Sequence, residues 1–393
     1  MCSDADESFN CLYCGEDKPS SQASLEHAIP QFMGGNSAPR HYFLRNVCEG
    51  CNNKLGLFVD ASYAKSWFFT NHLATASRRL YSGLQDQPLP LCCIGLLKAE
   101  NFTSPDGCVA ETWLGPSGET IIWIRKYDER VYWYSGGNPS DKRRTNSTAY
   151  FFPTSNDPTR FRMGIASFQT IFKAKKIRKI LCAQIEGLPA NSAFPGFDLP
   201  TEDERHTVDV LRRLLASGKV AGHYALNINF DLRFISKIAL AVGYSLFGEQ
   251  YLATQAAKEL RKGVWPAEGE TPEIMGAPSL SHPSDPLFTQ FAGYPGAVAL
   301  TVIRTGQSYG LTITIDQRLP FAVELAPATL ESKLIDPHAG YMLLLFPQLG
   351  KAIELSMADR IIHENGSRPH PELEEIDAKL LASRAFFAQL PPI

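Results

Sequence analysis

Two pairs of cysteines near the start of the chain constrain its fold more than any other feature. Cys11 and Cys14 are separated by two residues, and Cys48 and Cys51 repeat the same C-x2-C spacing. This is the spacing of zinc ligands, and four thiolates close a tetrahedral site around a structural ion. The sequence therefore predicts structural Zn2+ at these four residues. A zinc ion held by four thiolates has no open position, so any chemistry must come from residues beside it.

The overall composition is that of an ordinary globular protein. The chain has 393 residues, of which 44% are hydrophobic and 20% are charged, and this length indicates two or three domains. Nine cysteines are too few for a disulfide scaffold, so reduced thiols are expected. No apolar run reaches the roughly 20 residues of a bilayer span, and the acidic start MCSDADESFN lacks the pattern of a secretory signal. We expect a cytoplasmic protein with no membrane partner.

The residues between and after the cysteine pairs carry the candidate chemistry. The segment LEHAIPQFMGG places Glu26 beside His27, and CNNKLG places Asn52 near the start of a helix predicted over residues 53–80. If zinc clamps the two cysteine pairs together, the Glu26–His27 strand lies against the start of that helix. Carboxylate and amide oxygens suit a hard cation, and a free imidazole can take a proton from water. This combination favours hydrolysis of a phosphodiester.

The pattern between Cys11 and Asp60 resembles the HNH endonucleases. It consists of C-x2-C, then E-H-x-I-P followed by GG, then C-x2-C-N. The resemblance implies a ββα-metal fold in which His27 is the general base. It implies that Glu26 and Asn52 hold one catalytic divalent ion, Mg2+ or Mn2+, and that DNA is the substrate.

One position departs from the pattern of that family. Many members place an asparagine five residues before the third cysteine, where this chain has Phe43. The residue that orients the catalytic histidine therefore stays open among Asn36, His41 and Asn46. Asn52 has an alternative role as a helix N-cap, because asparagine is among the best capping residues.

The remaining chain is expected to give an α+β protein. The first part, residues 1–84, is the expected nuclease module with structural zinc, and residues 85–262 form an α+β middle region that begins with a β-meander. Residues 263–393 comprise a proline-rich linker and a β-rich region that ends in a helix. The expected fold class is therefore a zinc-containing ββα-metal module followed by a larger mixed α/β region with antiparallel sheet.

Several other residues have a structural and a functional interpretation. Asp60 is expected to be a solvent-facing helix acid, with a role beside the catalytic ion as its alternative. The basic run KAKKIRK (173–179) can track a phosphate backbone, but a solvated charged face is favoured. Trp113, Trp123 and Trp133 can stack on bases, but core or cross-strand packing is favoured.

These observations predict a metal-dependent HNH endonuclease that hydrolyses DNA, of a bacterial defence or restriction type. Its C-terminal region is expected to control it through a regulatory ligand or partner protein, and formation of a homo-oligomer stays open. One rival is a zinc-stabilised nucleic-acid-binding module without catalysis, in which Glu26 and His27 are incidental. Another is a mobile-element nickase that cuts one specific site.

Overall fold

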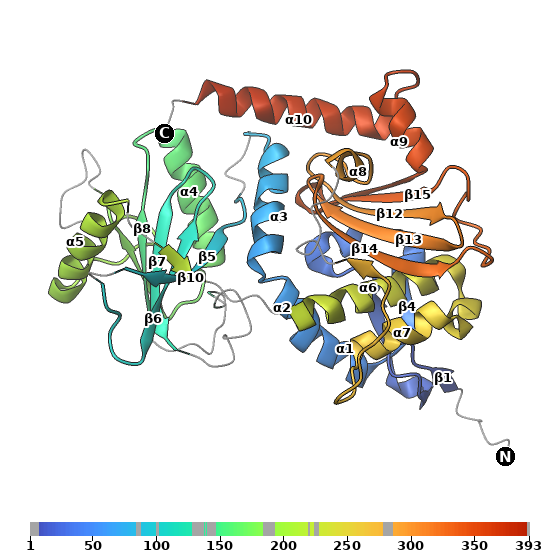
Figure 1. The fold of residues 1–393 in the computed structure, drawn as a ribbon. Coiled ribbons are helices and arrows are strands. Elements are labelled where there is room, and N and C mark those ends of the chain that lie inside the picture. The colour runs from blue at the N-terminus through green and yellow to red at the C-terminus, as the bar shows by residue number, and fades with distance from the viewer. Residues whose placement is uncertain are drawn as a thin grey trace, which may run out of the picture. The chain divides into compact units, whose positions relative to one another are not determined.

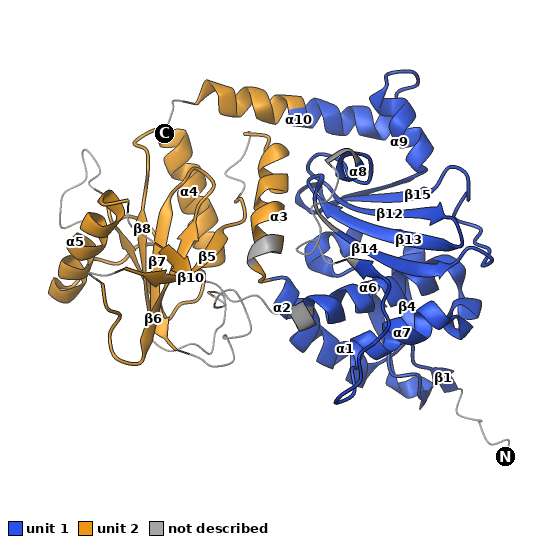
Figure 2. Cartoon of the chain, in the orientation of Figure 1, with its two compact units in different colours: residues 1–64, 227–380 blue, residues 65–226, 381–393 orange. Residues whose placement is uncertain are grey.

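The computed structural model describes residues 8–83, 88–99, 102–127, 137, 139, 147–183, 193–218, 221–223, 228–277 and 286–390. The chain is an α+β protein that divides into two compact units (Figure 2). Unit 1 comprises residues 1–64 and 227–380, and unit 2 comprises residues 65–226 and 381–393. Among the described helices, none combines the length and the apolar character that crossing a bilayer requires.

Residues 8–64, here called the N-terminal module, begin unit 1 with short strands followed by helix (Figure 1). The antiparallel pairs are β1 (Ser8–Asn10) with β2 (Asp17–Pro19) and β3 (Ala23–His27) with β4 (Phe43–Cys48). The helical part consists of α1 (Glu49–Leu55), a π-helical turn (Gly56–Asp60) and α2 (Ala61–Tyr63). The order of β3, β4 and α1 is the ββα order that the sequence predicts.

The single helix predicted over residues 53–80 is wrong in two respects. Helix α1 begins earlier, at Glu49, and a separate helix α3 (Trp67–Arg79) follows after a break. The break arises at Ser66, which has extended backbone angles and whose side chain accepts a hydrogen bond from the Phe69 amide. Serine is a strong N-cap, so the chain starts a new helix there. The periodicity of apolar residues did not reveal this interruption.

The rest of unit 1 combines a six-stranded antiparallel sheet with helices (Figure 1). The strand order is β11-β14-β13-β12-β15-β16. The strands are β11 (Gly276–Ala277), β12 (Val298–Thr305), β13 (Ser308–Ile315), β14 (Arg318–Pro327), β15 (Tyr341–Phe346) and β16 (Lys351–Leu355). The helices are α6 (Ile228–Phe247), α7 (Gln255–Val264), α8 (Pro286–Phe291), α9 (Met357–Glu364) and α10 (Pro371–Gln389), and the last residues of α10 belong to unit 2.

The division into units differs from the predicted three-part organisation. Residues 227–262 belong with the N-terminal module and the C-terminal sheet, whereas the sequence assigned them to the middle region. Packing explains the difference, because α6 and α7 both contact β14 and Phe234 of α6 stacks on Tyr63 with ring centroids 3.7 Å apart. The proline-rich stretch does not separate the units, since its described residues on both sides lie in unit 1.

Unit 2 contains a second six-stranded sheet, with strand order β10-β5-β6-β7-β8-β9. Strands β5 to β8 form an antiparallel meander, and β9 joins β8 in parallel after a crossover helix. Of the runs that the sequence assigns to its meander, CVAETWL and ETIIWIRKY correspond to β6 and β7, whereas RVYWYSGG (130–137) lies outside the described residues except for Gly137. The strands are β5 (Cys92–Lys98), β6 (Cys108–Leu114), β7 (Thr120–Lys126), β8 (Ser147–Phe152), β9 (Ile177–Leu181) and β10 (Ala221–His223). The helices are α3, α4 (Pro158–Ile171) and α5 (Glu202–Ala216).

The core of unit 2 decides between the two interpretations of the tryptophans. Trp123 is fully buried and Trp113 is 8% exposed, and both rings contact Phe172 edge to face. Core packing is therefore confirmed for these two, while Trp133 lies outside the described residues. In the basic run 173–179, Arg178 pairs with Glu204 at 2.8 Å. The lysines at 173, 175 and 176 are exposed, as a solvated face requires.

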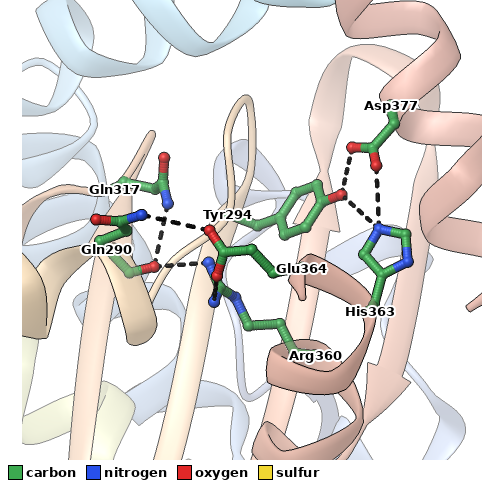
Figure 3. A network of polar contacts seen from close by, with 7 residues as sticks. All are labelled: Gln290, Tyr294, Gln317, Arg360, His363, Glu364 and Asp377. Atoms are coloured by element: carbon green, nitrogen blue, oxygen red, sulfur yellow. Dashed lines mark hydrogen bonds and ion pairs between the residues drawn. The ribbon is translucent and has the colours of Figure 1, made fainter. Parts of the chain in front are cut away.

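A polar network connects α9 to α10 within unit 1 (Figure 3). His363 Nε2 lies 3.0 Å from Asp377 Oδ2, and the hydroxyl of Tyr294 donates a hydrogen bond of 2.5 Å to Asp377 Oδ1. The other ring nitrogen of His363, Nδ1, accepts a hydrogen bond from the backbone N–H of His370. Both nitrogens of His363 are therefore bonded within the protein, which indicates a structural role.

A buried arginine links the same helix α9 to α8. Arg360 is 1% exposed, donates to the carbonyl oxygen of Gln290 at 2.7 Å and forms an ion pair with Glu364 (Figure 3). Gln317 donates to the same carbonyl oxygen at 3.0 Å. Because buried polar groups are costly unless they are bonded, these contacts define how α8 and α9 pack.

Candidate functional site

The four cysteines of the N-terminal module come together as the sequence predicts. Their Sγ atoms all lie within 4.8 Å of one another, and they are the only such group of histidine, cysteine or acidic side chains among the described residues. Four Zn–S bonds of about 2.3 Å in tetrahedral geometry place the sulfur atoms about 3.8 Å apart. The cluster therefore fits a structural zinc ion with little adjustment.

The surroundings of the cluster favour the thiolate at Cys11, whereas burial raises the pKa of Cys14 and the neighbouring Cys11 raises the pKa of Cys51. A hydrogen bond from Cys51 lowers the pKa of Cys11 to about 4, and the backbone N–H of Cys48 donates to Cys11 Sγ at 3.3 Å. Cys48 closes β4 and Cys51 lies in the first turns of α1, so zinc at this site would fix the strand against the helix. Zinc binding of this kind stabilises modules that have little core of their own.

Asn52 connects α1 to β3, the strand that carries Glu26 and His27, through two hydrogen bonds. Its Nδ2 donates to Ser24 Oγ at 3.1 Å and to the carbonyl oxygen of Leu25 at 3.0 Å. The predicted contact between β3 and the start of the helix is therefore confirmed. The alternative role of Asn52 as an N-cap is wrong, because Cys48 occupies the N-cap position and Asn52 lies one turn inside α1.

His27 ends β3 on a partly exposed face of the module. It lies directly opposite Phe43 in the β3–β4 register, and the two rings meet edge to face with centroids 4.8 Å apart. Phe43 is the residue that departs from the family pattern. At this position the chain supports the imidazole with an aromatic ring and not with an amide.

The three candidates for orienting His27 lie elsewhere. Asn36 is exposed, His41 Nε2 lies 3.6 Å from Glu354, and the backbone carbonyl of Asn46 accepts a hydrogen bond from Leu12. Within the described part of the chain, no hydrogen bond joins any of them to His27. The structure therefore places none of these three residues where it could orient His27 through a hydrogen bond.

The two glycines after the motif turn the chain back toward β4. Gly34 has φ +95°, a left-handed conformation that glycine adopts without strain. A Cβ on Gly35 would lie 1.8 Å from the carbonyl oxygen of Ile29. Both positions therefore require glycine, and the segment between His27 and β4 depends on them.

Glu26 is buried in the interior of unit 1, whereas its neighbour His27 is partly exposed. Glu26 is 4% exposed, accepts a hydrogen bond of 2.9 Å from the hydroxyl of Tyr13, and lies 2.9 Å from Lys237 Nζ. The same Nζ lies 2.5 Å from Asp60 Oδ2. Lys237 comes from α6 and is only 2% exposed. We call Tyr13, Glu26, Asp60 and Lys237 the acid cluster.

The charges of the acid cluster do not balance. Two carboxylates and one ammonium give a net charge of −1, and Asp60 Oδ1 is buried without a hydrogen-bond partner. Burial raises the pKa of Asp60, an effect that Lys237 opposes. Burial lowers the pKa of Lys237, but Glu26 and Asp60 outweigh it and the pKa lies above its ordinary value. The expectation that Asp60 is a solvent-facing acid is wrong, because α6 covers it.

Sequence reasoning missed Lys237 and Tyr13 as members of the site. One signal was available, since Lys237 is the only charged residue in the apolar run ISKIALAVGYSLFG. A lone lysine in an apolar helix is buried only with a partner of opposite charge. Its partners stand some 180 to 210 residues earlier in the chain, so no local pattern identifies them.

Comparison with known proteins confirms the resemblance for this segment. Residues 11–68 match the HNH endonuclease family, and the match includes all four cysteines together with Glu26, His27 and Asn52. The comparison with curated proteins and the comparison with solved structures gave no match. The family match does not reach α6, so Lys237 stands outside it.

Proposed function

We propose that the N-terminal module hydrolyses phosphodiester bonds of DNA as a metal-dependent endonuclease. The observation that supports this most strongly is the HNH match over a ββα unit that presents His27 on a partly exposed face. The four-cysteine cluster fits a structural ion and leaves the chemistry to its neighbours. Enzymes of this kind need a base, and His27 is the histidine at the motif position.

His27 acts in this proposal as the general base. Its imidazole takes a proton from the attacking water, and a positioned base contributes about 10² to 10⁴ in rate. Phe43 limits the rotation of the ring from across the hairpin. Asn52 keeps β3 against α1, so the base stays at a fixed distance from the helix.

A divalent ion, Mg2+ or Mn2+, belongs to the proposal and would stabilise negative charge on the phosphate. Asn52 has its amide nitrogen engaged with β3, which leaves Oδ1 as its ligand atom. Glu26 does not fit as a direct ligand in the present arrangement, because Tyr13 and Lys237 already bond its Oε1. The assignment of Glu26 and Asn52 as the ligand pair stays a prediction.

The proposal extends to control by the rest of unit 1. A nuclease without restraint damages the DNA of its own cell, and α6 contacts the module at the motif acid. We propose that this region restrains the nuclease in a cytoplasmic defence or restriction role until a regulatory ligand or partner protein engages it. The support for the defence role is the association of an HNH module with a large second region.

Cleavage of plasmid DNA tests the proposed activity. The wild-type chain should nick or linearise plasmid with Mg2+ or Mn2+ and should stop when EDTA is added. His27→Ala should lose cleavage, whereas His206→Ala, which changes an exposed histidine on α5, should retain it. Equal cleavage by wild type and His27→Ala would overturn the assignment of the base.

The rival function is nucleic-acid binding without catalysis. One observation favours it, because the motif acid Glu26 is held by Lys237 and not presented to solvent. This rival predicts DNA binding that is equal for wild type and His27→Ala, with no cleavage under any metal condition. A mobile-element nickase predicts cleavage at one site, which mapping of the product ends would reveal.

A further inference from the structure

The acid cluster joins the N-terminal module to α6 through Lys237, which lies 177 residues beyond Asp60 in the sequence. Lys237 Nζ lies 2.9 Å from Glu26 Oε1 and 2.5 Å from Asp60 Oδ2, so one ammonium bridges both carboxylates. The Lys237 side chain is 2% exposed, so its ammonium has no access to DNA in this arrangement. A role in contacting substrate is accordingly excluded for Lys237 while α6 is docked.

The position between the two carboxylates has the character of a cation site. Carboxylate oxygens are the ligands that Mg2+ and Mn2+ prefer. A monovalent ammonium leaves the pair at a net charge of −1, whereas a divalent ion would neutralise it. In addition, Asp60 Oδ1 is buried and lacks a hydrogen-bond partner. This oxygen therefore keeps a lone pair with which it could bind a metal ion.

We propose that Glu26 and Asp60 together form a divalent-cation site and that Lys237 is its internal competitor. The ammonium and the ion need the same oxygens, so only one of them occupies the site at a time. Docking of α6 therefore holds the module in a resting form, and withdrawal of Lys237 allows the ion to bind. The consequence for DNA cleavage rests on the function proposed above, but the competition itself does not.

Contacts around the cluster hold α6 in the docked position. Phe234, one turn before Lys237, stacks on Tyr63 at 3.7 Å and lies 6.0 Å from the ring of Phe32. Arg261 of α7 donates to the carbonyl oxygen of Leu12 in the zinc-binding loop at 3.0 Å. Binding linkage is reciprocal, so whatever loosens these contacts must strengthen ion binding by the same factor. A ligand that binds the region 227–380 and loosens α6 would thereby activate the site.

Binding of Mn2+ to the full chain tests the competition without reference to catalysis. Electron paramagnetic resonance of free Mn2+ gives the dissociation constant for wild type and for Lys237→Met, which keeps the apolar stem and removes the charge. Lys237→Met should bind Mn2+ on the order of ten- to a hundredfold more tightly, the usual range of such coupling. Lys262→Met is the matched control, because this lysine of α7 pairs with Glu259 away from the cluster. Its affinity should equal that of wild type.

A second variant covers the case in which Lys237→Met does not fold without the ion. Phe234→Leu keeps an apolar side chain, leaves all charges in place and weakens the stacking that docks α6. It should bind Mn2+ more tightly than wild type, although less tightly than Lys237→Met. Unchanged Mn2+ affinity in the folded Lys237→Met protein overturns the proposal. If that protein is unfolded even with Mn2+, unchanged affinity in Phe234→Leu overturns it.

The same proteins separate this inference from the proposed function. Tighter Mn2+ binding together with faster plasmid cleavage at low metal concentration supports both. Tighter Mn2+ binding without cleavage by any variant supports the competition and removes the endonuclease function. Normal His27-dependent cleavage with unchanged Mn2+ affinity in Lys237→Met keeps the function and removes the competition.

Discussion

The two units each contain a buried ion pair, and the pairs are built differently. In unit 2, Arg125 of β7 meets Glu111 of β6 within one sheet, with exposures of 3% and 0%. In unit 1, Lys237 meets Glu26 and Asp60, which come from distant parts of the chain. The first pair has one charge of each sign, whereas the second has two negative charges for one positive charge.

The pairs also differ in how fully their polar atoms are bonded. Glu111 accepts hydrogen bonds from Arg125 Nε at 2.9 Å, from the Gly137 amide at 2.8 Å and from Trp113 Nε1 at 3.3 Å. Asp60, in contrast, keeps one buried oxygen without a partner. A balanced and fully bonded pair stabilises one structure, while an unbalanced pair with a spare acceptor can exchange its cation. The contrast agrees with the proposal made above, in which the pair in unit 2 is structural and the site in unit 1 is exchangeable.

Loss of zinc should have the largest effect: it should disorder the acid cluster of unit 1 and leave the Arg125–Glu111 pair of unit 2 unchanged. In Cys48→Ala only three thiolates remain, and zinc binding is worth on the order of 10 kcal/mol in small modules. Tyr13, which donates to Glu26, lies between Cys11 and Cys14, so the acid cluster should lose its order with the zinc. Elemental analysis should find well below one zinc per chain, and hydrogen exchange should rise in the module while β6 and β7 stay protected. Retained zinc and unchanged exchange would refute the four-cysteine site.

Replacing the proposed base His27 should lower the rate of DNA cleavage and leave the four-cysteine cluster and the acid cluster intact. We expect His27→Ala to lower the rate of DNA cleavage by about 10² to 10⁴ with unchanged zinc content and unchanged melting. The physical reason is that His27 lies on the partly exposed face of β3, whereas Glu26 points to the interior. A large fall in the melting temperature of this variant would show that the two faces of β3 are not independent.

Breaking the Arg125–Glu111 pair of unit 2 should lower the free energy of unfolding without affecting DNA cleavage. Arg125→Met leaves the Glu111 carboxylate buried without its cation, and such changes destabilise proteins by about 3 to 5 kcal/mol. Chemical denaturation followed by tryptophan fluorescence would measure this, because Trp123 and Trp113 lie in the same core. Arg212→Met, which breaks an exposed pair with Asp209, should change stability by less than about 0.5 kcal/mol. Comparable losses in both variants would remove the distinction between buried and surface pairs.

Asp231, a partly buried acid on α6, should show the smallest effect and a definite pH dependence. Burial raises the pKa of Asp231 from 3.8 to about 6, so the folded state favours the protonated acid more than the unfolded state does. Stability is therefore lost as the pH rises from about 4 through 6. Asp231→Asn should gain about 1 to 3 kcal/mol at pH 8 and nothing at pH 3.5. Denaturation at both pH values measures this, with the exposed Asp209→Asn as control, and a gain that does not depend on pH would contradict the assignment.

The sequence predicted the zinc ligands, the ββα order and most strands, because these depend on short spacings and local periodicity. It assigned His27, Glu26 and Asn52 to one region, and the structure confirms the contact between β3 and α1. It could not predict the interior environment of Glu26, since the partner Lys237 reaches it only through the packing of α6. The division into units escaped prediction for the same reason, because stacking of Phe234 on Tyr63 joins segments that no local pattern connects.

The response of the two buried pairs to Mg2+ tests the distinction between them most directly. Hydrogen exchange of β3 and of β6 should be measured in Lys237→Met and in Arg125→Met, each with EDTA and with millimolar Mg2+. We predict that Mg2+ restores protection of β3 in Lys237→Met, because the ion takes the place of the ammonium between Glu26 and Asp60. Mg2+ should leave β6 unprotected in Arg125→Met. Equal protection of β3 with and without Mg2+ in Lys237→Met would contradict the account.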